Sequence, residues 1–314
     1  MSAVSAGGSA RTEPGVFAGI AGNAGPLRLL ESQLQTGRLS HAYLFAGESG
    51  LGKLSVARRF AQALLPETLL RRHPDYWEDC REDSLKIDEI RLLPDRQPEF
   101  HEQSLQAFLS RTPAIAGRRV AVIANVGRLR DQTQGILLKT LEEPHPNRVI
   151  ILTTPSISPF VVLPTVVSRC QRVAFHPALE SEVRGALLAS GVEPELAAVL
   201  AGLARGRPGW ALGAAAEPEV VARHVAAVEA LETVFGAPAD VPLRLAAQYD
   251  SAPSATAVLG SWQLRIRESM LSEPVPGPWA RLLEQSFETL GHLEQNVSPR
   301  LALECFLLAC RRVS

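Results

Sequence analysis

The sequence of 314 residues predicts an α/β domain with a parallel sheet, followed by a part that is entirely helical. Two observations predict this order. Up to about residue 176, apolar strand-like runs alternate with amphipathic helices, as is typical of a parallel sheet covered on both faces. Beyond that point the strand-like runs cease, and the remaining apolar residues recur at helical spacing.

The composition is that of an ordinary globular protein, with 46% apolar and 21% charged residues. The formal net charge is −1, so no global field draws the chain to nucleic acid or anionic lipid. No apolar run approaches the roughly 18 residues that a bilayer-spanning helix needs. We therefore expect a cytoplasmic protein with no membrane contact, and we expect residues 1–15, which are small and flexible, to form a disordered tail.

Four apolar stretches are the predicted strands of the sheet. They are residues 42–47, 118–126, 148–154 and 169–175. The first is followed by an amphipathic helix at 52–65 that Pro66 ends, and the second by a helix at 131–143 that Pro144 ends. Because parallel strands share one carboxyl edge, ligands of such a sheet are expected beyond that edge.

The stretch GESGLGKL (residues 47–54) joins the first strand to the first helix and resembles a phosphate-binding loop. The pattern G-x-x-x-x-G-K-[ST] needs a hydroxyl after the lysine, because that oxygen ligates magnesium. Here Leu54 stands at that position, and Ser55 lies one residue too far along the helix. The candidate phosphate-binding residues are Gly47, Gly50, Gly52 and Lys53.

A second part of an ATP-hydrolysing site is also absent. Such sites hold magnesium with an acidic residue at the end of the next strand, whereas this strand ends in Ala124 and Asn125. No Asp or Glu occurs from residue 118 to residue 130. Three interpretations remain: a loop kept only for folding, a site that binds nucleotide without turnover, and a working ATPase with an unusual metal site.

Arg169, in the stretch LPTVVSRCQ (residues 163–171), follows a loop that leaves the third strand. One interpretation is a surface arginine paired with a carboxylate. The other is an arginine finger, because a guanidinium keeps its charge and can make bidentate contacts with phosphate. Spacing alone does not decide between them.

The C-terminal part is predicted to be helical. Short helices are expected at residues 183–190 and 194–204, followed by a turn at 206–209. From about residue 217 the chain is expected to be all helix, with breaks near 236–242, 252–253 and 274–278. In the last helix, Ser298 is the predicted cap and Pro299 suits the first turn.

Several motifs together resemble one known family. They are HAYLFAGESGLGK (41–53), HPDY (73–76), KIDEIR (86–91), LLKTLEEP (137–144), LPTVVSRCQ (163–171), GRPGWAL (206–212) and NVSPRLALE (296–304). In this order and spacing they resemble the delta-prime subunits of the bacterial DNA polymerase III clamp loader, which belong to the AAA+ superfamily. The resemblance covers the chain from about residue 16 to its end.

The resemblance implies an AAA+ P-loop-type domain at 16–176, a small helical lid at 177–216 and a helical collar for oligomerisation at 217–314. It implies a non-catalytic subunit of a ring that opens the sliding clamp and places it on primed DNA. Arg169 would complete the ATP site of a neighbouring gamma/tau subunit, supported by Ser168 and Cys170 of the SRC motif. Gly209 stands where active AAA+ subunits place a lid arginine that senses nucleotide.

The partners implied are the gamma/tau ATPase subunits and the delta subunit, with the clamp and primed DNA reached mainly through the complex. Related subunits carry four zinc-binding cysteines before HPDY; here that module is missing, so we expect no metal and no cofactor. An ATPase subunit that still binds ATP and a simple DNA-binding module are the alternative functions. Near-neutral charge disfavours the DNA-binding module, and we expect five arginines to form a solvated basic surface: Arg111, Arg118, Arg119, Arg128 and Arg130.

Overall fold

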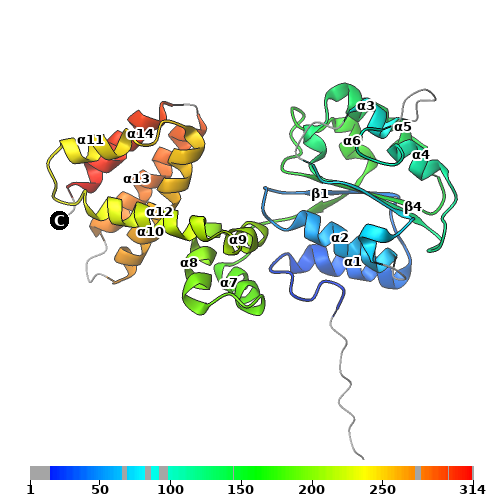
Figure 1. The fold of residues 1–314 in the computed structure, drawn as a ribbon, viewed down its shortest axis with the longest axis horizontal. Helices are drawn as coiled ribbons and strands as arrows, with labels where there is room; N and C mark the ends of the chain where they lie inside the picture. Colours follow the sequence, from blue (N-terminus) through cyan, green and yellow to red (C-terminus); the bar gives the residue numbers. More distant parts are fainter. Residues whose placement is uncertain are drawn as a thin grey trace, which may run out of the picture. The chain divides into compact units, whose positions relative to one another are not determined.

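The computed structural model describes residues 15–65, 69–81, 86–91, 98–143, 145–272, 277–295 and 297–312 (Figure 1). These residues form two compact units, which we call the sheet unit and the helical unit. The sheet unit comprises the chain up to Ser190 together with Arg205–Trp210, and the helical unit comprises Gly191–Ala204 and Ala211–Ser314. The predicted boundaries of the sheet, lid and collar domains stay a prediction, and residues 1–14, Pro66, Pro144 and most of the 274–278 break lie outside the described ranges.

The predicted parallel sheet is confirmed. In the described residues it has five strands in the order β2-β3-β4-β1-β5, and every neighbouring pair is parallel. The strands are β1 (Ala42–Ala46), β2 (Tyr76–Asp79), β3 (Arg119–Ile123), β4 (Arg148–Thr154) and β5 (Gln171–Ala174). No pattern in the sequence predicts β2, because its four residues alternate in burial at the sheet edge and form no apolar run.

Both faces of the sheet are covered by helices (Figure 1). Along β1 the side chains alternate, so that Leu44 faces one apolar core and Tyr43 and Phe45 face the other. One core contains residues of α3 (Ile87–Ile90), α4 (Leu105–Ser110), α5 (Asp131–Glu142) and α6 (Pro164–Arg169). The other contains residues of α1 (Ala24–Thr36) and α2 (Lys53–Leu64).

The structure corrects the prediction around Arg169. This residue neither follows a loop nor begins a strand: it is the last residue of helix α6, and β5 starts at Gln171. Proline at the first position of α6 supplies a helical φ, and buried Val166 anchors the turn to the core. Short 3₁₀ turns, η1 (Leu70–Arg72) and η2 (Val126–Arg128), and helix α7 (Glu180–Ala189) complete the connections.

The helical unit contains α8 (Pro194–Ala204), α10 (Pro218–Glu232), α11 (Asp240–Ala246), α12 (Ala252–Ser272), α13 (Gly277–Glu294) and α14 (Pro299–Cys310). Helix α9 (Pro208–Ala215) begins in the sheet unit and ends in the helical unit. The core of α10–α14 centres on Trp262, which is fully buried and donates from Nε1 to the carbonyl oxygen of Ala227 at 2.8 Å. Ser298 occupies the cap position of α14, but its side chain makes no capping hydrogen bond.

Candidate functional site

The phosphate loop lies at the carboxyl edge of the sheet, between β1 and α2. Its three glycines all have positive φ: 149° at Gly47, 83° at Gly50 and 84° at Gly52. At Gly47 a Cβ atom would lie 2.4 Å from the carbonyl oxygen of Phe175, so only glycine fits there. The glycines of the motif therefore have a conformational reason to be present.

Lys53 is the first residue of α2, and it is almost completely buried. Its amine donates to the carbonyl oxygens of Gly47 and Glu48, the latter at 2.5 Å. Burial lowers the pKa of Lys53 to about 8, and the nearby Glu48 carboxylate only partly opposes that effect. The amine that would meet phosphate oxygens is thus oriented into its own loop.

The two positions where the motif calls for a hydroxyl and an acid are Leu54 and Asn125. Leu54 packs against the apolar core on the α1–α2 face, and Ser55 is exposed. At the carboxyl end of β3, Asn125 adopts a left-handed backbone conformation, and its backbone N–H donates to Thr153 Oγ1 at 2.9 Å. Leu54, in place of the hydroxyl, therefore serves apolar packing, and Asn125, in place of the acid, serves a backbone turn.

The start of α9 contacts the phosphate loop directly. The Gly209 amide donates to the carbonyl oxygen of Gly50 at 2.8 Å, and the Trp210 amide approaches the same oxygen at 3.3 Å. A Cβ atom at Gly209 would lie 2.9 Å from that oxygen and 3.3 Å from the Gly52 nitrogen. The close approach therefore depends on glycine at the position where the resemblance implies a lid arginine.

A buried cluster of charged residues at the end of β2 was missed by sequence reasoning. The Asp79 side chain is fully buried and forms ion pairs with Arg81 and Arg128. His101 lies 3.6 Å from Asp79 and 2.6 Å from the buried Glu89 carboxylate. Arg81 is near Asp79 in the sequence, but Arg128 is 49 residues away, and the cluster follows no motif spacing, so only the fold brings it together.

The cluster also corrects the expected basic surface. The side chain of Arg128 is only 6% exposed, in its pair with Asp79. Arg119 is likewise buried, donating to the carbonyl oxygen of Thr112 and lying 3.5 Å from Asp75. Arg119 and Arg128 therefore do not belong to a solvated surface, because each side chain is buried and paired with a buried carboxylate.

Arg169 lies at the surface of the sheet unit. Its Nη2 atom is 2.6 Å from Oε1 of Glu142, and its Nη1 atom donates to the carbonyl oxygen of Thr165 at 3.1 Å. Ser168 also contacts the Thr165 carbonyl oxygen, at 3.0 Å, and lies 3.5 Å from Nη1 of Arg169. Cys170 is buried in the core, and burial raises the pKa of its thiol to about 12, so it packs and does not ionise at neutral pH.

Gln134 connects the segment before α5 to the segment before α6, a role that sequence reasoning also missed. Its side-chain amide donates to the carbonyl oxygens of Leu129 and Val161, and its oxygen accepts the amide of Leu163 at 2.9 Å. Gln134 is nearly fully buried in α5. A polar residue within the apolar stripe of a predicted helix was the available sign of such a role.

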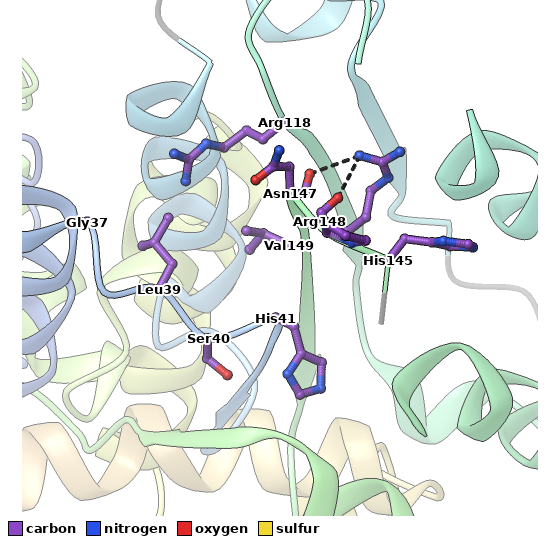
Figure 2. Close-up of a pocket in the computed structure, with 10 residues that line it drawn as sticks. Gly37, Leu39, Ser40, His41, Arg118, His145, Asn147, Arg148 and Val149 are labelled. Atoms are coloured by element: carbon purple, nitrogen blue, oxygen red, sulfur yellow. Dashed lines mark hydrogen bonds between the residues drawn. The ribbon is translucent and has the colours of Figure 1, made fainter. Parts of the chain in front are cut away.

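A shallow basic pocket of about 350 Å³ lies at the opposite edge of the sheet (Figure 2). Its lining residues lie just before β1, β3 and β4 or at the start of β4, and they include His41, Arg118, His145 and Arg148. The guanidinium of Arg148 is engaged by backbone oxygens, among them the carbonyl oxygen of Leu109 at 2.7 Å. The pocket is therefore separate from the phosphate loop, which follows β1.

Within the described part of the chain, no group of three or more His, Cys, Asp or Glu side chains is placed to hold a metal ion. In the same residues, no helix combines the length and the apolar character that crossing a membrane requires.

Comparison with known proteins identifies relatives of this chain. The family model described as "DNA polymerase III, delta subunit" matches residues 22–178. DNA polymerase III subunit delta' of Bacillus subtilis is 28% identical over 190 residues, which cover 56% of this chain and 54% of that protein. Subunit tau of Escherichia coli is 33% identical over 171 residues, which cover 52% of this chain and 25% of that protein.

A second delta' subunit, from Pseudomonas aeruginosa, is 29% identical over 154 residues, which cover 43% of each chain. The chain thus spans about half the length of the curated delta' relatives it matches. Among solved structures, a gamma subunit-related protein of DNA polymerase III from Thermotoga maritima superposes with a TM-score of 0.51 at 20% identity. That match covers 90% of this chain and 98% of the other, which shows a common fold.

Proposed function

Since this chain belongs to the DNA polymerase III delta subunit family, we propose that it is a non-catalytic, delta'-type subunit of the clamp loader. It combines an AAA+ α/β domain with a helical C-terminal part. In this proposal it helps to load the sliding clamp onto primed DNA. It does not hydrolyse ATP, and its helical C-terminal residues form the collar that holds the ring of subunits together.

The observation that carries the proposal is a phosphate loop that keeps its glycine conformations without its magnesium ligands. Leu54 and Asn125 occupy the two positions from which a hydroxyl and an acid would hold the metal. Lys53 is hydrogen bonded within its own loop, and Gly209 lies against Gly50. These contacts favour a loop kept for its fold over one that turns over nucleotide.

In the same proposal, Arg169 acts in trans on the ATP site of an adjacent gamma/tau subunit. Its side chain is 35% exposed at the end of α6, so a neighbouring subunit can reach it. Ser168 and Cys170 support it: Ser168 contacts the guanidinium, and Cys170, the residue after Arg169, is buried in the core. The arginine supplies positive charge where the γ-phosphate develops negative charge.

The partners in the proposal are the gamma/tau subunits and the delta subunit. The sliding clamp is contacted mainly through the complex, and primed DNA weakly through the complex. The similarity to delta' and tau subunits of DNA polymerase III supports membership of such an assembly. A cytoplasmic location stays a prediction.

A second candidate is a subunit that still binds ATP at its own loop. It is favoured by the intact positive-φ conformations of Gly47, Gly50 and Gly52 around Lys53. Saturable ATP binding by the purified chain that Lys53→Met abolishes would establish it, whereas binding at the background level of Lys53→Met would remove it.

The test of the first candidate is steady-state ATP hydrolysis by the isolated chain and by the chain assembled with its cognate clamp-loader subunits. We expect no turnover by the chain alone, stimulation on assembly, and a loss with Arg169→Ala. At a single site an arginine finger raises kcat by about 10³-fold or more. The loss of hydrolysis is smaller where other ATP sites of the ring remain active. Arg172→Ala, an exposed arginine on β5, is the matched control and should leave hydrolysis unchanged. Turnover by the isolated chain, or full activity of the Arg169→Ala complex, would contradict the proposal.

A further inference from the structure

Arg169 is held within its own chain by an acidic residue of a neighbouring helix. Glu142 is the last residue of α5, and α5 packs against α6, which ends at Arg169. Oε1 of Glu142 lies 2.6 Å from Nη2 of Arg169, while the Thr165 carbonyl oxygen accepts from Nη1. The guanidinium is therefore occupied at both terminal nitrogens in the free chain.

A phosphate group competes with the Glu142 carboxylate for the N–H donors of Nη2. Arginine binds phosphate most tightly through two parallel N–H donors, and the carboxylate already takes one of the donors that such a pair can use. A γ-phosphate has more acceptor oxygens and more negative charge than one carboxylate. A carboxylate that stayed in place would also repel it.

We propose that Glu142 is a cis-acting latch, whose carboxylate occupies the finger arginine until the γ-phosphate of a neighbouring subunit displaces it. The inference rests on the proposed function, because it needs Arg169 to act in trans. The latch makes engagement of the arginine depend on bound triphosphate, so that docking of the subunits alone does not commit Arg169 to the neighbour's site.

The exposure of the pair sets the strength of the latch. The side chains of Glu142 and Arg169 are 47% and 35% exposed, so water and salt screen their attraction. Exposed ion pairs change an equilibrium constant by about 1.5- to 5-fold. A latch of this size weakens the binding of Arg169 to the γ-phosphate without preventing it.

The test uses the assembled clamp loader and measures the ATP concentration that gives half-maximal hydrolysis. We expect Glu142→Gln to lower that concentration by about 1.5- to 5-fold, without lowering the maximal rate. Glu143→Gln is the control, because it makes the same charge change at the next residue. Glu143 is exposed, and among the described contacts the carboxylate paired with Arg169 is that of Glu142, so this variant should have no effect. In an Arg169→Ala background the effect of Glu142→Gln should disappear, because the two residues act as one unit.

The outcomes separate the latch from the function beneath it. Unchanged hydrolysis with Arg169→Ala would reject the trans-acting arginine itself. A loss with Arg169→Ala, combined with identical behaviour of Glu142→Gln and Glu143→Gln, would reject the latch alone. A reduced maximal rate with Glu142→Gln would also reject the latch, since it would mean that the carboxylate aligns the arginine for catalysis.

Discussion

Lys53 is a cation whose surroundings favour its neutral form. Burial lowers the pKa of its amine from 10.5 to about 8, so between these two values the unfolded chain binds more protons than the folded chain. The free energy of unfolding should therefore rise with pH across this window, by an amount of the order of 3 kcal/mol for this group.

The measurement is chemical denaturation of the wild type and of Lys53→Met from pH 7 to pH 10.5. We expect the wild type to gain stability relative to Lys53→Met as the pH rises above about 8, because its amine then loses the unfavourable charge. Lys139→Met is the control, since Lys139 is exposed and its removal relieves no burial. A constant difference between wild type and Lys53→Met across this range would contradict the assignment.

Gly209 is a second residue at which one atom decides the local structure. In Gly209→Ala the new Cβ atom would lie 2.9 Å from the Gly50 carbonyl oxygen, so the start of α9 must move from the phosphate loop. We expect faster hydrogen exchange of the Trp210 amide, corresponding to a loss of about 1–3 kcal/mol in local stability. Gly213→Ala in the same helix meets no atom within 4 Å and should leave that amide unaffected.

At the scale of elements, the edge strand β2 is joined to η2 by buried charge. Arg128→Met would leave the fully buried Asp79 carboxylate with Arg81 as its remaining arginine partner. Breaking one side of a buried pair should lower the free energy of unfolding by roughly 3 kcal/mol, measured by denaturant titration. Arg58→Met is the matched control, because Arg58 pairs with Glu78 on the same strand but is 39% exposed, and it should cost less than about 1 kcal/mol. Equal losses in the two variants would contradict the importance of burial.

At the scale of the whole molecule, the sheet unit and the helical unit have separate apolar cores. Trp262→Ala removes the largest fully buried side chain and its hydrogen bond to the Ala227 carbonyl oxygen. We expect a loss of about 3–5 kcal/mol in the helical unit, with hydrogen exchange in β1 and β4 unchanged. An equal rise of exchange in both units would show that they unfold as one.

Much of the fold followed from local patterns in the sequence. The four predicted strands overlap β1, β3, β4 and β5, because strands of a parallel sheet covered on both faces are rich in apolar side chains. The phosphate-loop motif also predicted the turn at Gly47, Gly50 and Gly52, where the positive φ values favour glycine. In contrast, β2 and the short helix α6 were missed because four to six residues contain too little periodicity.

The sequence by itself determined the class of fold, the glycine pattern of the loop between β1 and α2, and the presence of Leu54 and Asn125 where the motif calls for a hydroxyl and an acid, because these depend on residue type at fixed spacing. Only the tertiary structure decided which partners the charged residues have. The Arg169–Glu142 pair joins the ends of two helices, and the Asp79–Arg128 pair joins a strand to a distant turn. Coulomb attraction depends on distance in space, and only the packing of helices and strands sets that distance for residues far apart in the chain.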